Sequence, residues 1–209
     1  MKKVFFGVFA LLAVFISFYP ISYLFIDSNT GFLSGKSGEL LSSTLWWIGF
    51  YLHISFGGIA LFVGWSQFIS RVRQKYPKIH RIIGKIYVIS VIISSIAGIG
   101  IGFFATGGVI SATGFVLLGV VWFSFTVDAV RFIKAGDVIN HQKAMIISYA
   151  VCFAAVTLRI YLGPLIMFFD DFVIAYRIVA WLCWVPNIAV ALMIVRTHPS
   201  PEITLSRTI

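Results

Sequence analysis

Residues 82–105 read IIGKIYVISVIISSIAGIGIGFFA, an apolar run of the length that one α-helix needs to cross a lipid bilayer. Lys85 is the one charged residue within it. Five further runs of similar length and character lie at 4–26, 44–69, 110–132, 144–168 and 172–195. This pattern predicts an all-α membrane protein, in which residues 1–209 form a single transmembrane domain, a bundle of six transmembrane helices.

The composition of the whole chain supports the same class. Of its 209 residues, 60% are hydrophobic and 11% are charged, whereas charged residues make up about 25% of a typical soluble domain. So much apolar surface excludes an ordinary soluble protein. The first apolar run follows Lys2 and Lys3 but has no small-residue cleavage site after it, so we expect a retained helix rather than a signal peptide.

The basic residues gather on one side of the predicted bundle. They flank the first helix, the 2–3 loop, the 4–5 loop and the end of the sixth helix: Lys2, Lys3, Arg71, Arg73, Lys75, Lys78, Arg81, Lys85, Arg131, Lys134, Lys143, Arg196 and Arg207. The other side has Lys36 with Asp27, Glu39, Asp170 and Asp171. Because basic loops mark the cytoplasmic side, both termini are predicted to be cytoplasmic, in a multi-pass protein of the plasma membrane.

The same placement explains the net charge of +9. Loops rich in Lys and Arg at a membrane surface set the topology and contact anionic lipids, so we expect the lipid bilayer and its anionic lipids as partners. No aromatic-interleaved soluble module accompanies the basic residues, and we expect no nucleic-acid partner.

Three predicted helices each carry a histidine on a stripe of small or polar residues. Read at helical spacing, the stripes are His53, Gly57, Ala60, Gly64 and Gln67; His80, Gly84 and Tyr87; and His141, Met145 and Ser148. Small residues let a helix or a flat cofactor approach closely, and ionisable residues within a span usually face the bundle interior. The stripes therefore predict an interior site, whose candidate cofactor-binding residues are His53, His80, His141, Arg159, Gly57 and Gly84.

The polar residues fall at two depths. With a rise of ~1.5 Å per residue, His53 and Arg159 lie roughly 13 Å below the outer boundary, whereas His80 and His141 share the cytoplasmic rim. No carboxylate is predicted at the depth of Arg159, and an unpaired charge there costs at least ~2.5–3.5 kcal/mol. Backbone carbonyls, tyrosines and internal water would solvate it in one interpretation. In the other it binds an anionic or oxygen-rich ligand: a haem propionate, a quinone carbonyl or a lipid phosphate.

The order of these motifs resembles that of a known family. The motifs are His53 with its glycine-rich continuation, Gly64-x2-Gln67-Phe68, His80-Arg81-x2-Gly84-x2-Tyr87, and His141-x3-Met145 leading to Thr157-Leu158-Arg159. Over about residues 50–165 they resemble the bacterial membrane proteins catalogued as domain of unknown function 2306. The chain departs from that pattern at Ala144 and Ile147, where an aromatic and a second basic residue are expected. The resemblance implies a multi-helix, histidine-bearing membrane protein without an assigned activity.

Two of the functions that fit these features need no substrate. The first is an accessory or assembly protein that binds another membrane protein, for example in a respiratory complex. The second is a b-type haem protein that transfers electrons within the membrane, to or from quinone in one version, with haem b as the leading candidate cofactor. His80 and His141 would then be the haem iron ligands, or would bind a metal ion instead.

A third function is that of a small-molecule transporter or membrane-embedded enzyme. Its midplane pocket would be lined by His53 and Arg159, and Pro20, Pro164 and Pro186 would interrupt the helices around it. The sequence has no Ser/His/Asp set, carboxylate pair, phosphate loop or CxxC motif, so it predicts no catalytic residue.

Overall fold

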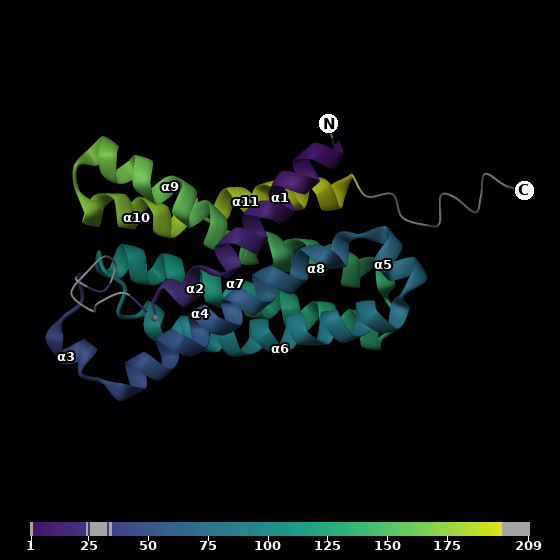
Figure 1. Cartoon of the computed structure of the whole chain (residues 1–209), viewed down its shortest axis with the longest axis horizontal. Helices are drawn as coiled ribbons and strands as arrows, with labels where there is room; N and C mark the ends of the chain where they lie inside the picture. The colour runs from purple at the N-terminus through teal and green to yellow at the C-terminus, as the bar shows by residue number, and fades with distance from the viewer. Residues whose placement is uncertain (1, 24, 26–32, 34, 198–209) are drawn as a thin grey trace, which may run out of the picture.

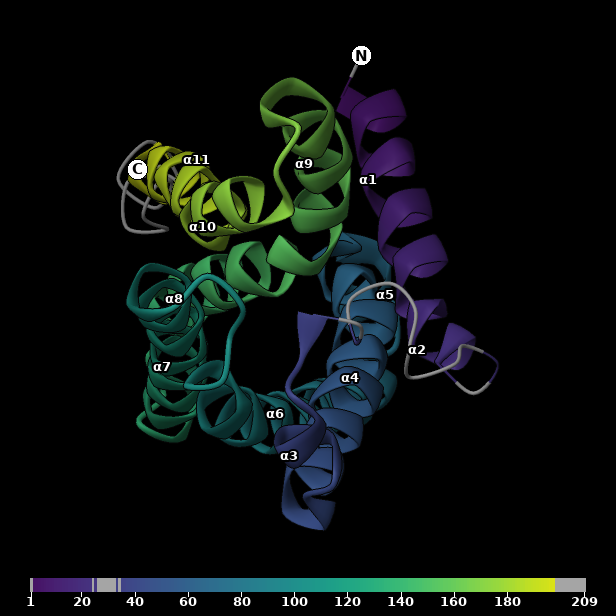
Figure 2. The ribbon, with the colours of Figure 1, turned by 90° about the vertical axis from the view of Figure 1, so that its left-hand side faces the viewer.

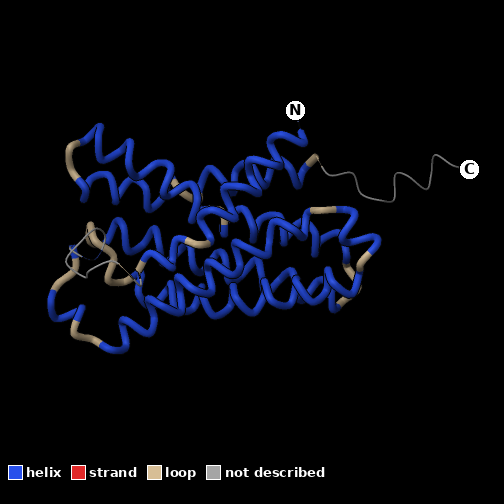
Figure 3. The backbone as a smooth tube through the Cα atoms, viewed as in Figure 1, coloured by secondary structure: helices blue, strands red, loops and turns tan. Residues whose placement is uncertain are grey.

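A computed structural model describes residues 2–23, 25, 33 and 35–197 of the chain. Within these residues the regular elements are all helices (Figure 3), and six spans are long and apolar enough to cross a membrane. The predicted all-α bundle of six transmembrane helices is therefore confirmed. Asp27 and Arg207, which contributed to the predicted orientation, lie outside the described residues.

Four helices that follow one another in the chain form the centre of the bundle. They are α4 (Thr44–Gly64), α6 (Pro77–Gly102), α7 (Val109–Lys134) and α8 (Val138–Cys152). α6 contacts α4 and α7, and α8 contacts α7 and α4, so α6 and α8 stand diagonally opposite each other (Figure 2). Small residues permit these contacts: a Cβ added to Gly119 of α7 would lie 2.7 Å from Cγ1 of Ile99 on α6.

The remaining helices cover one side of this centre (Figure 1). They are α1 (Lys2–Ser17), α9 (Ala154–Phe169), α10 (Phe172–Leu182) and α11 (Val185–Arg196). α10 packs on α9 and α7, α11 on α8, and α1 on α4 and α9. Four short elements complete the fold: α2 (Tyr19–Ser22), α3 (Gly38–Leu41), the 3-10 helix η2 (Trp65–Phe68) and α5 (Ser70–Lys75).

Two central helices begin before the apolar runs that predicted them. α6 starts at Pro77 and α8 at Val138, so His80 and His141 each lie in the first turns of a helix. Proline suits a first turn because it lacks the N–H that would have no acceptor there. Before α8, the Asp137 side chain accepts a hydrogen bond from the backbone N–H of Asn140, which lowers the pKa of Asp137 below its ordinary value. Hydropathy alone misses such polar first turns.

Three of the six predicted helices are interrupted rather than continuous. The breaks lie at Phe18, at Phe153, and at Cys183–Trp184. At the last two breaks, Asn187 Nδ2 donates to backbone carbonyls, that of Ala150 (3.2 Å) and that of Cys183 (3.0 Å). These two carbonyls thus accept a hydrogen bond from a side chain. Thr157 Oγ1 also donates to the Cys183 carbonyl. The expected interruption at Pro164 is wrong, since this residue lies inside the continuous helix α9.

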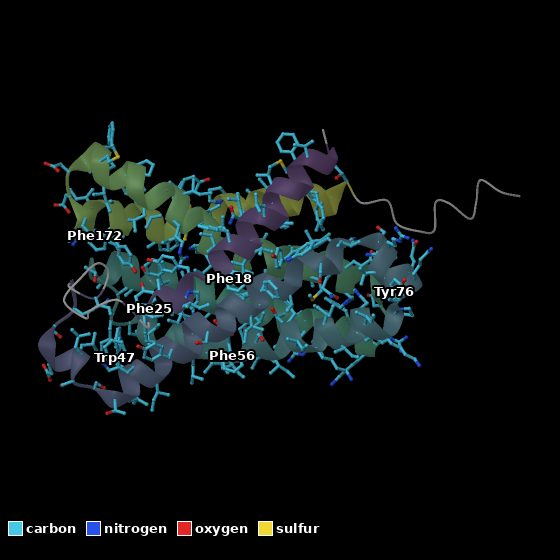
Figure 4. The ribbon with its side chains drawn as sticks, in the orientation of Figure 1. Phe18, Phe25, Trp47, Phe56, Tyr76 and Phe172 are labelled. Carbon is cyan, nitrogen blue, oxygen red and sulfur yellow. The ribbon has the colours of Figure 1, made fainter. Side chains whose placement is uncertain are left out.

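The two ends of the bundle differ in their side chains (Figure 4). Trp47 and Phe172 lie at one end, and Tyr76 lies at the other, among nitrogen-bearing side chains. The start of α1 and the end of α11 lie at the same end as Tyr76 and α5 (Figure 1). Aromatic residues commonly mark the two membrane interfaces, so the long axis of the bundle corresponds to the membrane normal. The cytoplasmic location of the Tyr76 end stays a prediction of the basic loops.

Cysteine labelling tests that orientation. Glu39→Cys and Lys78→Cys each place a thiol at an exposed position on opposite ends of the bundle. We expect a membrane-impermeant maleimide to label Glu39→Cys in intact cells and Lys78→Cys after permeabilisation only. The unmodified chain is the control, because Cys152 and Cys183 are both buried. The reverse labelling pattern would mean that the bundle is inverted.

Candidate functional site

His53 lies in a tight contact between α4 and α6. Its Nδ1–H donates to the carbonyl of Ser94 (2.9 Å), and Ser94 Oγ donates to the carbonyl of His53 (2.8 Å). A Cβ added to Gly98 would lie 2.6 Å from His53 Nδ1, and one added to Gly57 would lie 3.1 Å from Ser94 Oγ. The space that Gly57 and Gly98 leave is therefore filled by Ser94 and His53 themselves, as in a close helix–helix contact.

A buried hydrogen-bond network joins the centres of α6, α7 and α8. Tyr87 Oη and Ser148 Oγ share a hydrogen bond of 2.8 Å, and Thr126 Oγ1 and Ser148 Oγ share one of 2.7 Å. Tyr87 lies two helical turns after His80, and Ser148 lies two turns after His141. The direct bond shows that the stripes of α6 and α8 face each other across the axis of the bundle.

At the Tyr76 end, the same two stripes bring His80 and His141 into electrostatic range of each other. Nδ1–H of His141 donates to the carbonyl of Ala129 (2.8 Å), whereas His80 Nδ1 is buried without a hydrogen-bond partner among the described residues. The side-chain nitrogen of Gln67 is also buried and unpartnered there. Gln67 Oε1 lies 3.5 Å from the position of a Cβ on Gly84. Gln67, which the sequence placed on the stripe of His53, thus lies against the stripe of His80.

Arg159, on α9, lies among aromatic rings nearer the opposite end. Nη1 donates to the carbonyl of Ala155 (2.6 Å), and Cζ lies 4.0 Å from the ring centroid of Tyr19. Tyr23 and Tyr176 lie within electrostatic range of Arg159. His53 does so too, so the structure brings together the two residues that were predicted at one depth. Arg159 Nε is buried without a partner, and no carboxylate lies within 4.0 Å of the guanidinium in the described part of the chain.

The tyrosines around Arg159 are the residues that sequence reasoning did not specify. Tyr19 belongs to α2, Tyr23 follows it, and Tyr176 lies on α10. None of them falls in a motif. The spacing i, i+4 between Tyr19 and Tyr23 places both on one helical face, which is the signal that could have identified them.

A cavity of about 720 Å³ opens at the end of the bundle opposite Tyr76, between α3 and the loop after α6. Lys36, Glu39 and Thr106 are among its lining residues. Lys36 Nζ donates to the carbonyl of Phe104 (2.6 Å), and burial lowers the pKa of Lys36 to about 8. A neighbouring cation, Arg177, donates through Nε to the carbonyl of Gly107 (2.8 Å). The cavity is thus lined by one cation, Lys36, and one carboxylate, Glu39, with Arg177 bonded to its lining residue Gly107.

The packing around the glycines bears on the candidate cofactors. A haem needs a flat slot beside its axial ligands, but the faces of Gly57 and Gly84 are covered by Ser94 and Gln67. The geometry favours a smaller ligand at the histidines. Across the described ranges, no three His, Cys, Asp or Glu side chains form a metal-binding group, so a metal site here would use the histidine pair with other donors.

Comparison with models of known protein families finds a match. A family model described as predicted membrane protein (DUF2306) matches residues 50–195, well over half of the chain. The match includes the helices that carry His53, His80, His141 and Arg159 and leaves α1 and α2 outside. No curated protein and no solved structure matches the chain.

Proposed function

We propose that this chain, which belongs to the family described as predicted membrane protein (DUF2306), binds an anionic ligand in the half of its bundle that contains Arg159. The family description names no activity, so the proposal depends on the geometry of the chain. In the same proposal the chain is one transmembrane domain in the plasma membrane, with both termini in the cytoplasm. The Arg159 site then faces the outer half of the bilayer.

The observation that carries the proposal is the guanidinium of Arg159, for which the described residues provide no carboxylate. An intramembrane charge is costly unless it is compensated, and such residues usually mark functional sites. The carbonyl of Ala155 and the face of the Tyr19 ring compensate part of the charge, yet Nε has no partner among the described residues. A carboxylate or phosphate oxygen would supply the missing charge and acceptor, and the planar guanidinium can bind both oxygens of such a group.

The surroundings of Arg159 favour an amphiphilic anion. Tyr19 and Tyr23 are aromatic neighbours whose ring centroids lie 5.7 Å apart. They offer apolar faces to a hydrocarbon chain and hydroxyl groups to its acidic head. Two helix breaks, at Phe153 and Cys183–Trp184, lie close to Thr157 and so near the same level. Paired interrupted helices next to a buried charge are the arrangement that transporters use for anionic substrates.

A comparison of matched amphiphiles tests the proposed function. The protein is placed in nanodiscs of uncharged phosphatidylcholine, and calorimetry measures the binding of decanoate, decyltrimethylammonium and acetate. After subtracting the partitioning of each amphiphile into protein-free nanodiscs, we expect decanoate to bind and the cation of equal chain length not to bind. Acetate separates the sources of the anion: binding as tight as that of decanoate indicates a water-soluble ligand, and weaker binding indicates a lipid acid. Equal binding of the anionic and cationic amphiphiles would refute the role of Arg159.

The pH dependence of this binding tests a contribution from Lys36, the cation in the cavity at the same end of the bundle. Because burial lowers the pKa of Lys36 to about 8, its ammonium loses its charge as the pH rises from about 7 to 9. We expect decanoate affinity to fall about 1.4- to fivefold over this range, since such charge interactions are worth roughly 0.2–1 kcal/mol. Lys36→Arg keeps its charge and should remove the pH dependence. An unchanged pH profile in Lys36→Arg would show that another group is responsible.

An accessory or assembly role is the second candidate, and the internal bonding of the polar residues favours it. His53, Tyr87 and Tyr149 all have hydrogen-bond partners within the bundle, so these groups stabilise packing without a ligand. This role requires a stable membrane-protein partner. Crosslinking in membranes followed by native electrophoresis would reveal it, whereas a chain that always migrates alone would contradict it.

A further inference from the structure

The end of the bundle opposite Arg159 contains a second set of polar groups, which the anion site does not use. α6 and α8 stand diagonally across the bundle, and His80 and His141 lie on their facing stripes. The hydrogen bond between Tyr87 and Ser148 fixes the register of the two stripes two turns away. The two imidazoles therefore approach the bundle axis from opposite sides, at one level.

The Nδ1 atoms of the two imidazoles differ in their hydrogen bonds. Nδ1–H of His141 donates to the Ala129 carbonyl (2.8 Å), which holds the ring and leaves Nε2 with its lone pair. Histidines that bind metals are usually oriented by such a bond from the other ring nitrogen. His80 Nδ1 is buried and has no partner in the described ranges of the chain. A buried polar atom of this kind requires an explanation.

Gln67 provides a third group. It belongs to η2, and its side chain lies over Gly84, one turn from His80. Its amide nitrogen is buried without a partner within the described residues. Rotating the carboxamide by half a turn exchanges the nitrogen and the oxygen, so a carbonyl oxygen can occupy the same buried position.

We propose that His80, His141 and the side-chain oxygen of Gln67 bind a divalent transition-metal ion at this end of the bundle. Imidazole is a ligand that zinc, copper and nickel prefer, with Zn–N bonds of ~2.0–2.1 Å. A haem would need the space over Gly84 that Gln67 fills. The remaining coordination positions take water or an anion, which the nearby Arg73 and Arg81 attract.

Metal titration of the purified full chain, without a histidine tag, tests this site. Cu²⁺ is added alone, its affinity is measured by calorimetry, and electron paramagnetic resonance counts the coordinated nitrogens. We expect one ion per chain with two imidazole nitrogens. His80→Ala and His141→Ala should each weaken binding at least about 100-fold, and Gln67→Ala about tenfold, in keeping with loss of a ligand or its support.

Controls separate this site from the other histidines and from misfolding. His53→Ala and His198→Ala should bind Cu²⁺ as the unmodified chain does, and metal-free thermal unfolding identifies any variant that fails to fold. Gln67→Glu offers a carboxylate ligand at the same position and should restore or strengthen binding if it folds. Binding that persists in the His80→Ala/His141→Ala double variant would overturn the proposal. A Soret band that depends on the two histidines would also overturn it, in favour of haem iron.

Discussion

Replacing Arg159 with glutamine should weaken decanoate binding roughly 10- to 100-fold. A hydrogen bond to a charged group is worth about 1.5–3 kcal/mol, and each 1.4 kcal/mol corresponds to about a factor of ten in affinity. Glutamine keeps a planar amide that can donate to the carbonyl of Ala155, which now accepts from Nη1 at 2.6 Å. The substitution thus removes the positive charge with little change in local shape. Calorimetry in uncharged nanodiscs measures the effect.

The controls for this prediction distinguish binding from structure. Arg131→Gln removes a positive charge that is exposed and paired with Asp128 (3.1 Å), and it should leave decanoate affinity unchanged. Arg159→Lys keeps the charge but loses the planar fork, so an intermediate affinity is expected. Because the described residues compensate the ligand-free guanidinium incompletely, Arg159→Gln should unfold at the same or a higher temperature than the unmodified chain. A variant that unfolds much earlier and still binds decanoate would identify a structural role instead.

Replacing Gly64 with alanine should destabilise the bundle by about 1–3 kcal/mol or more, the range for overpacked cores. A Cβ at Gly64 would overlap the Tyr149 ring and lie 2.8 Å from Cε2 of Tyr87. Neither ring can move away easily: both are buried, and Tyr149 Oη donates to the carbonyl of Leu61 (2.9 Å). Unfolding in mixed detergent micelles, followed by circular dichroism, measures the loss.

Gly100→Ala is the matched control. Gly100 lies within α6, and a Cβ there meets no atom within 4 Å. Alanine lowers the conformational entropy of the unfolded chain, so this variant should gain roughly 0.5–1 kcal/mol. If Gly64→Ala and Gly100→Ala unfold at the same denaturant concentration, the contact of α4 with Tyr149 is not as close as the structure indicates.

Much of the fold could be predicted because membrane insertion depends on local composition. A run such as 82–105 is long and apolar enough to span the bilayer wherever it lies in the fold. The six spans follow from such runs, and the structure confirms them. The break at Cys183–Trp184 agrees with the interruption that Pro186 predicted, because this proline lies in the first turn of α11. The break at Phe153 has no proline to predict it; beside it, Asn187 of α11 bonds to the carbonyl of Ala150.

The candidate site, like the fold, could be predicted from the sequence only in part. Helical spacing placed His80 and His141 on stripes that turn inward, and Arg159 at the depth of His53. It also suggested that Gly57 and Gly84 leave room for a cofactor. The side chains that cover these glycines, Ser94 and Gln67, come from a neighbouring helix or element, and a periodicity cannot say which neighbour that is.

By itself, then, the sequence determined that this chain is a six-helix membrane protein, and it predicted which faces of three helices turn inward. Hydropathy and helical periodicity are properties of contiguous residues, so they need no knowledge of the fold. The tertiary structure decided what the buried faces meet: Tyr19 and Tyr176 around Arg159, and Gln67 beside the His80–His141 pair. These groups are far apart in the chain, and only the packing of whole helices brings their side chains together.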